Sequence, residues 1–189
     1  MLNYCFFDVN GYPKAAGVTE GNTAPIGSTV LTTAQFANRS NLILQAGSIV
    51  TMPTKPSIYH TWSSTGWVLL PVDATRQLTD AMIAQGKILG LAYYNAIQIP
   101  VAYMGTTFQS DIASQDTLNK VLVGLNGTTP VGFYWVDAVN AKISMTNAQL
   151  QGLAGVMLAQ GWTAFQRLQT RKDALKIATT LAQIQAVVW

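Results

Sequence analysis

The chain has 189 residues and a formal net charge of +3, and only 10% of its side chains are charged, against roughly 25% in an ordinary soluble domain. Apolar residues make up 49%, which excludes an intrinsically disordered chain, and the length allows one domain or two small ones. Cys5 is the only cysteine, so an internal disulfide and a thiolate metal cluster are excluded.

The low charge indicates a protein that works inside an assembly, because a free monomer usually keeps a charged surface. The N-terminus lacks the basic and apolar regions of a signal peptide, and no apolar run has the length needed to span a bilayer. We therefore expect synthesis in a cytoplasm and no membrane insertion. The densest basic cluster is Arg167, Arg171, Lys172 and Lys176. It is typical of cations at a helix end rather than of a nucleic-acid footprint, so we expect no nucleic-acid partner.

The N-terminal part, residues 1–72, is predicted to be strand-rich with one short helix. Thr32 or Thr33 favours a helix that continues through Leu42–Leu44 and ends at Gly47. Asn10-Gly11 indicates a tight turn. Strands are predicted at 2–9, 48–52, 57–62 and 66–70, the last two as a hairpin with a tryptophan on each arm.

A connecting helix is predicted over residues 73–97, with Asp73 as its cap. Gly86 and Gly90 weaken it in isolation but permit close helix–helix approach, so it is either an oligomer seam or a plain connector. Our candidate interface residues share an apolar character and lie on this helix or at the C-terminus. They are Leu78, Met82, Leu89, Tyr93 and Trp189.

Residues 98–189 are predicted to form a C-terminal α+β domain, a β-hairpin packed on a long amphipathic helix. Asp111 is a helix cap, and Asp137–Asn140 marks the hairpin turn. Thr146 and Gln149 have the spacing of a capping box, which predicts the start of the long helix. Its apolar residues recur every three or four positions: Leu150, Leu153, Ala154, Met157, Leu158, Trp162, Phe165 and Leu168. This spacing predicts one stripe that packs on the hairpin.

Residues able to carry catalysis are scarce. His60 is the only histidine, which excludes a multi-histidine metal site. A Ser–His–Asp arrangement stays open on residue types alone, but no nucleophile-elbow pattern accompanies it. The eight acids are scattered, several at caps and turns, and no Gly-rich loop has the spacing that cradles phosphate. We therefore expect no enzyme and no cofactor.

The tryptophans have two interpretations. Aromatic residues on apolar faces usually belong to a core. Trp62 and Trp67 are nevertheless candidates for stacking against host glycans, because pyranose faces pack on aromatic rings. Exposed, coplanar rings would favour the glycan interpretation.

From about Gln98 onward the chain resembles a domain family of unknown biochemical function found in tailed-phage tail and tail-fibre proteins. The likeness rests on Gly105–Asp111, the tryptophan hairpin with Asp137 and Asn140, and Ile143–Thr146 leading into a helix. The N-terminal half is similar to tail-fibre assembly proteins through Tyr59 and Trp62–Val68, but it lacks their acidic stretch.

The resemblance implies a structural component of a phage virion, at the tail fibre or baseplate, that acts by protein–protein contacts in host attachment. Its expected partners are other tail proteins and further copies of itself, and its expected location is the virion after synthesis in the host cytoplasm. Two alternatives stay open: a tail-fibre assembly chaperone and a glycan-binding receptor-recognition module. A glycan hydrolase would need two acids facing each other across a cleft.

Overall fold

The structure, a computed structural model, describes all of residues 1–189. It contains both helices and strands, and its N-terminal region is rich in strands, so the predicted α+β class is confirmed. By packing, the chain divides into two compact units, Met1–Gln77 and Leu78–Trp189. The boundary lies inside the long helix α2 (Pro71–Ala96).

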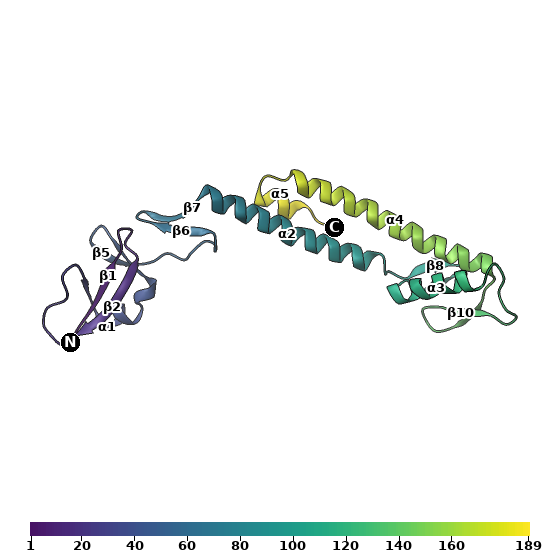
Figure 1. Cartoon of the computed structure of the whole chain (residues 1–189), viewed down its shortest axis with the longest axis horizontal. Helices are drawn as coiled ribbons and strands as arrows, with labels where there is room; N and C mark the ends of the chain where they lie inside the picture. Colours follow the sequence, from purple (N-terminus) through teal and green to yellow (C-terminus); the bar gives the residue numbers. More distant parts are fainter. The chain divides into compact units, whose positions relative to one another are not determined.

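Unit 1 opens with a three-stranded antiparallel sheet in the order β2-β1-β3. Its strands are β1 (Leu2–Phe7), β2 (Pro13–Thr19) and β3 (Thr29–Leu31) (Figure 1). The predicted turn at Asn10-Gly11 is confirmed, and Asp8 Oδ1 stabilises it by accepting the N–H groups of Asn10 and Tyr12. Gly11 has a φ of 81°, and a Cβ there would overlap the carbonyl oxygen of Leu44, so this position requires glycine.

The predicted helix ending at Gly47 is wrong beyond its first turn. The chain instead forms helix α1 (Thr33–Ala37), the 3-10 turn η1 (Arg39–Asn41) and the paired strands β4 (Leu42–Gln45) and β5 (Ser48–Thr51). Thr32 does cap α1, and Gln35 completes a capping box. Ala46 and Gly47 both have positive φ, as a two-residue hairpin turn of type I′ requires, so Gly47 closes a hairpin rather than a helix.

The second predicted hairpin of unit 1 is confirmed as β6 (His60–Ser63) paired with β7 (Gly66–Leu69). Trp62 lies directly opposite Trp67 in this pair. The indole N–H of Trp62 donates to the carbonyl oxygen of Asn10 at 3.1 Å. That bond joins the hairpin to the β1–β2 turn within unit 1.

Unit 2 is dominated by helices. Its elements after α2 are β8 (Val101–Tyr103), β9 (Thr106–Phe108), α3 (Ile112–Gly124), β10 (Tyr134–Val136), β11 (Lys142–Ser144), α4 (Asn147–Ile177) and α5 (Leu181–Ala186). The predicted caps Asp111 and Thr146 are confirmed, and Thr180 opens α5 with a third capping box. Pro100 lies just before β8 and outside it, so its missing N–H removes no hydrogen bond from the strand pair.

Helix α2 begins two residues before the predicted cap. Pro71 is its first residue, a position that proline favours because its fixed φ suits a helix and its missing N–H is not needed there. Asp73 therefore lies within the first turn, where a carboxylate interacts favourably with the positive end of the helix dipole. No helix of the chain combines the length and the apolar character needed to cross a bilayer.

Unit 2 contains two hydrophobic clusters at different places along α4. The first joins α4 to α3 and to the small strands, and comprises Val101, Phe108, Leu118, Met145, Leu150, Leu153 and Met157. Phe133, Trp135 and Ile143 of the β10–β11 region pack against it, so the predicted contact between hairpin and long helix is confirmed there.

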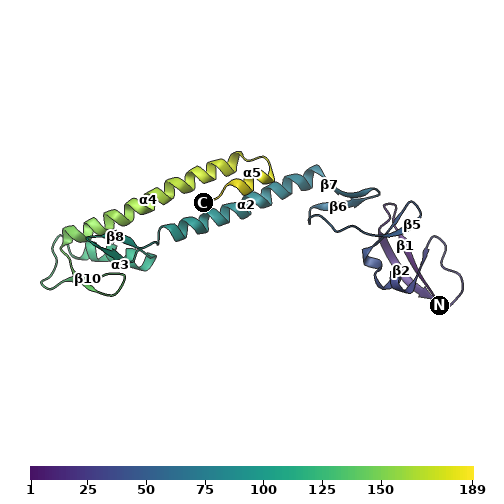
Figure 2. The ribbon, with the colours of Figure 1, turned by 180° about the vertical axis from the view of Figure 1, so that it is seen from behind.

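The second cluster joins α2, the C-terminal half of α4 and α5, and comprises Leu89, Leu168, Leu175, Ala178, Ile184 and Val187. Figures 1 and 2 show α5 lying between α4 and the part of α2 that belongs to unit 2. The side-chain amide of Gln85 donates to the carbonyl oxygen of Val187 at 2.7 Å and so holds the C-terminal segment to α2.

Candidate functional site

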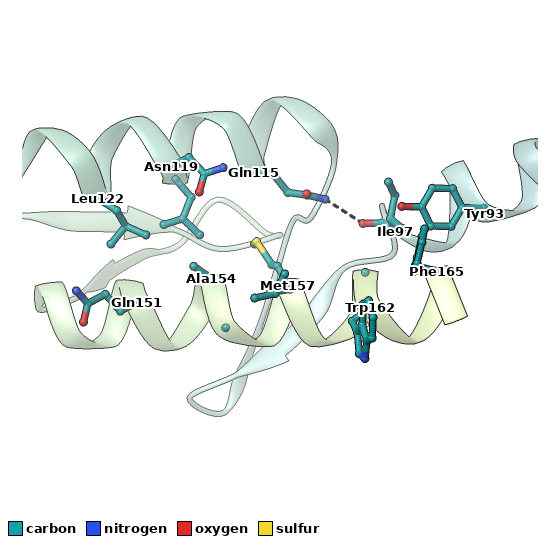
Figure 3. A pocket seen from close by; sticks show the side chains of 14 residues that line it. Tyr93, Ile97, Gln115, Asn119, Leu122, Gln151, Ala154, Met157, Trp162 and Phe165 are labelled. Carbon is teal, nitrogen blue, oxygen red and sulfur yellow. Dashed lines mark hydrogen bonds between the residues drawn. The ribbon is translucent and has the colours of Figure 1, made fainter. Parts of the chain in front are cut away.

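A groove lies where α3, α4 and the C-terminal end of α2 meet (Figure 3). Its volume is about 760 Å³, and 14 residues line it. They are Tyr93, Ile97, Gln115, Leu118, Asn119, Leu122, Gln151, Ala154, Gly155, Met157, Leu158, Gly161, Trp162 and Phe165. None of them carries a charge, and the lining is mostly apolar. Such a groove suits an uncharged, largely apolar partner surface.

Two glutamines fix the walls of this groove. The amide nitrogen of Gln115 donates to the carbonyl oxygens of Ile97 and Ser110, at 3.0 and 2.7 Å, and Figure 3 shows the first of these bonds. The amide nitrogen of Gln160 donates to the carbonyl oxygens of Ala96 and Ile99, at 3.1 and 2.8 Å. Both side chains thereby hold the segment between α2 and β8, which would otherwise leave backbone carbonyls unpaired.

The middle of α4 is exposed, contrary to the predicted continuous stripe. Leu150, Leu153 and Leu168 are buried as expected, but Leu158 is 74% exposed and Trp162 57%. On this helix the first cluster ends at Met157 and the second begins at Leu168, and the side that carries Leu158 and Trp162 between them is left largely uncovered. An exposed apolar stretch of this kind marks an interaction surface more often than a free one.

Trp162 and Phe165 form a stacked pair at the edge of the groove. Their ring centroids are 5.7 Å apart and their planes differ by 21°. Figure 3 shows Phe165 directed toward Tyr93, whereas Trp162 is directed away from α3. The apolar spacing of this helix included both residues, but that spacing does not indicate that they are exposed. Two features of the sequence could have indicated an interaction surface here: residues 147–166 carry no charge, and the helix contains three glycines.

The five candidate interface residues all belong to the second cluster. Leu89 is fully buried at the centre of that cluster, so in this structure it is closed to any partner. Leu78, Met82, Tyr93 and Trp189 are partly buried around it. A Cβ built on Gly86 would lie 3.9 Å from Cδ2 of Leu175. The close helix approach expected at this glycine therefore occurs within the chain. Tyr93 alone of the five also lines the groove.

The opposite face of α2 is the exposed one. Its apolar residues include Ile83, Ile88, Leu91 and Tyr94, all more than half exposed. Trp189 is held by Arg167, whose guanidinium carbon lies 5.0 Å from the centre of the indole ring. The C-terminal tryptophan is therefore docked within unit 2, and one member of the basic cluster contacts its ring.

Trp62 and Trp67 do not form an exposed flat platform. Trp62 is only 7% exposed. The two rings meet edge to face, with centroids 5.3 Å apart and planes 86° apart. The indole N–H of Trp67 donates to the carbonyl oxygen of Pro53 at 2.7 Å. A pyranose ring stacks on an open aromatic face, so this geometry favours the core interpretation of the pair.

His60 contacts a serine, but within one tight turn. Ser57 Oγ and His60 Nδ1 are 2.8 Å apart, and the same hydroxyl accepts the N–H of Tyr59 at 3.2 Å. The backbone N–H of His60 also donates to the carbonyl oxygen of Ser57. These local bonds explain the pair as a turn that leads into β6, the ordinary use of serine in such positions.

Two aspartates show lowered pKa values for structural reasons. The N–H and hydroxyl of Ser114 both donate to Asp111, and these bonds lower the pKa of its carboxyl group. The N–H of Ala141, the hydroxyl of Thr106 and the N–H of Val139 do the same for Asp137, against a smaller opposing effect of burial. Each acid stabilises a cap or a turn, and neither has the raised pKa of a general acid.

Cys5 is buried in β1, and burial raises the pKa of its thiol, which keeps the group protonated. No cluster of three or more histidine, cysteine, aspartate or glutamate side chains gathers in the chain. The groove of unit 2 combines a mostly apolar lining with exposed α4 side chains, and this makes it suited to binding.

A protein-family comparison matches residues 89–188, just over half of the chain, to the Domain of unknown function (DUF4376). The chain belongs to this family. The DUF4376 domain begins at Leu89, the buried residue at the centre of the second cluster, and not at about Gln98 as the sequence resemblance had indicated. It includes the whole groove from Tyr93 to Phe165. No curated protein and no solved structure matches the chain.

Proposed function

We propose that this DUF4376 protein is a structural component of a tailed-phage virion, at the tail fibre or baseplate, that acts by protein–protein contacts in attachment to the host. The observation that carries the proposal is the uncharged groove with its exposed α4 residues Leu158, Trp162 and Phe165. A solvent-exposed tryptophan beside further apolar residues is the usual composition of an interface centre.

Two features of the sequence support the tail assignment. The pattern from Gly105 to Thr146 resembles a domain found in phage tail proteins, and it lies inside the DUF4376 domain. The low share of charged residues, 10%, suits a chain whose surface is covered by neighbours. The assembly-chaperone alternative has no structural feature of its own to favour it, and the Trp62–Trp67 geometry lends no support to glycan recognition at that pair.

The test is to count the chain against the major tail proteins by quantitative mass spectrometry of purified phage particles. We expect a fixed copy number per particle, for example a multiple of three or six. Absence from particles together with co-purification alongside free fibre protein would favour the chaperone instead. Absence from both would overturn the tail assignment.

A matched pair of substitutions tests whether the groove attaches the chain to the phage particle. Phage particles carrying Trp162→Ala should contain less of this chain, because the substitution removes the largest exposed apolar side chain of α4. Thr163→Ala, at the neighbouring exposed position, is the control and should leave the copy number unchanged. Equal copy numbers for both variants would show that the groove is not the attachment surface.

A further inference from the structure

The exposed side of α4 has the spacing of a helix–helix seam. Gln151, Gly155, Leu158, Trp162 and Phe165 follow one another at intervals of four, three, four and three residues. This alternation keeps side chains in line along one side of a helix that packs against a second helix. All five residues line the groove and all are exposed. The seam is therefore complete within α4 but lacks a partner helix.

One small and one large residue of this seam, Gly155 and Phe165, lie at equal distances on either side of Gln160. A Cβ built on Gly155 would meet no atom within 4 Å, so open space lies over this residue. Phe165 is its large counterpart, ten positions further along. When two such helices run antiparallel with their midpoint at Gln160, Phe165 of one lies over Gly155 of the other, and Leu158 lies beside Trp162. Interdigitation of large and small side chains is what close helix packing requires.

Charge selects the antiparallel arrangement. Residues 147–166 carry no charged side chain, whereas Arg167, Arg171, Lys172 and Lys176 follow on the same helix. A parallel pair would place one basic cluster beside the other, which is repulsive. An antiparallel pair places each basic cluster beside the uncharged N-terminal half of the other helix. It also sets the two helix dipoles in opposite directions.

We propose that two copies of this chain pair through α4, antiparallel and about a two-fold axis near Gln160, with Leu158, Trp162 and Phe165 at the centre of the contact. A two-fold contact uses the same surface on both copies, the commonest form of homo-oligomer. The inference rests on the proposed role in protein–protein contacts and names the partner. It is tested on the purified chain, so its failure is distinguishable from absence of the chain in particles.

The first test is sedimentation of the purified full chain over a concentration series. We expect a reversible monomer–dimer equilibrium built on the monomer mass of 20.4 kDa. Trp162→Ala should weaken the dimer at least about tenfold, because a buried interface tryptophan is typically a hot spot. Leu91→Ala, which removes an exposed apolar side chain from α2, is the matched control and should leave the dimer unchanged.

The Gly155→Leu variant distinguishes an effect on dimer formation from an effect on the stability of the monomer. The open space over Gly155 admits the new side chain in the monomer, and leucine is a better helix former than glycine, so the melting temperature of the diluted monomer should rise. The same side chain would occupy the place of the second copy's Phe165, so the dimer should weaken. A rise in melting temperature together with weaker pairing is the expected result.

Cysteine cross-linking tests the direction of the pair. In a Cys5→Ala background, a mixture of Leu158→Cys and Trp162→Cys chains should form a mixed disulfide faster than Leu158→Cys chains alone, since a disulfide needs Cα atoms within about 7 Å. Faster self-linking of Leu158→Cys would indicate a parallel pair and overturn the proposal. A monomeric wild-type chain, or a dimer that Trp162→Ala leaves intact and Leu91→Ala weakens, would overturn it as well.

Discussion

At the scale of single residues, Asp137 shows how one side chain joins elements that are distant in sequence. Its Oδ1 accepts the N–H groups of Val139 and Ala141 and so forms the turn of the β10–β11 hairpin. Its Oδ2 accepts the hydroxyl of Thr106 at 2.9 Å, which joins that hairpin to β9. The sequence predicted the turn, because an aspartate commonly bonds to the backbone two residues on. The bond to Thr106 depends on the folded chain.

We expect Asp137→Asn to lower the melting temperature at neutral pH, because it removes the charge that these three donors stabilise. The folded pKa of Asp137 is lowered, so its contribution to stability is fully present above its unfolded pKa of about 4 and is lost as the pH falls through the folded pKa. The difference in melting temperature between wild type and variant should therefore narrow from pH 7 to pH 2, as measured by circular dichroism.

Asp116→Asn is the control for this prediction, since Asp116 is exposed on α3. It should change the melting temperature little at any pH. A wild-type advantage over Asp137→Asn that stays constant or grows as the pH falls would contradict the role given to this carboxylate.

At the scale of elements, α4 contains residues with three different functions. Its first turn is closed by a reciprocal pair of bonds, in which Thr146 Oγ1 accepts the N–H of Gln149 at 3.3 Å and Gln149 Oε1 accepts the N–H of Thr146 at 2.8 Å. Both ends of the helix then contribute to separate hydrophobic clusters. In the segment between the clusters, Gln160 donates to the carbonyl oxygens of Ala96 and Ile99, whereas the side with Leu158 and Trp162 is exposed and forms one wall of the groove.

Thr146→Ala should lower the free energy of unfolding by about 1 kcal/mol, the usual cost of removing a helix N-cap. Thr163→Ala is its matched control in the same helix, because the Thr163 hydroxyl bonds only to the carbonyl oxygen of Ala159, within the helix. Alanine is the better helix former, so this variant should be neutral or slightly stabilised, within about 0.5 kcal/mol. Urea unfolding measures both, and equal losses would contradict the capping role.

At the scale of the whole molecule, each unit has buried apolar residues of its own. In unit 1 these are Cys5, Leu31, Leu42, Ile43 and Trp62, and unit 2 has its two clusters. Helix α2 begins at Pro71 and carries Leu89, which is fully buried in the second cluster. The part of the chain from residue 71 onward therefore contains every residue of both clusters of unit 2.

A fragment of residues 71–189 should fold alone, with a helical circular dichroism spectrum and cooperative thermal unfolding. A fragment of residues 98–189 is the matched control. It lacks Leu89 and leaves Leu168, Leu175 and Ile184 without their α2 partner, so its melting temperature should be clearly lower. Equal melting temperatures for the two fragments would show that α2 does not stabilise the DUF4376 domain.

The sequence alone determined the features that depend on residues within about four positions of one another. The capping box at Thr146, the cap at Asp111 and the turns at Asn10-Gly11 and Asp137–Asn140 were all predicted and are all present. For the first helix the sequence left Thr32 and Thr33 as alternative caps, and Thr32 is the cap in the structure. Each is a local hydrogen-bonded motif with a fixed spacing, so the sequence contains all the information that it needs.

Only the tertiary structure decided which apolar residues are covered. Leu42–Leu44 fit a helix by composition but form a strand that pairs with β5, and Leu42 and Ile43 are buried there. Leu158 and Trp162 fit the buried stripe of α4 by spacing but stay exposed. Spacing places a side chain on a face of its own element, whereas burial depends on whether a segment far away in the chain packs against that face.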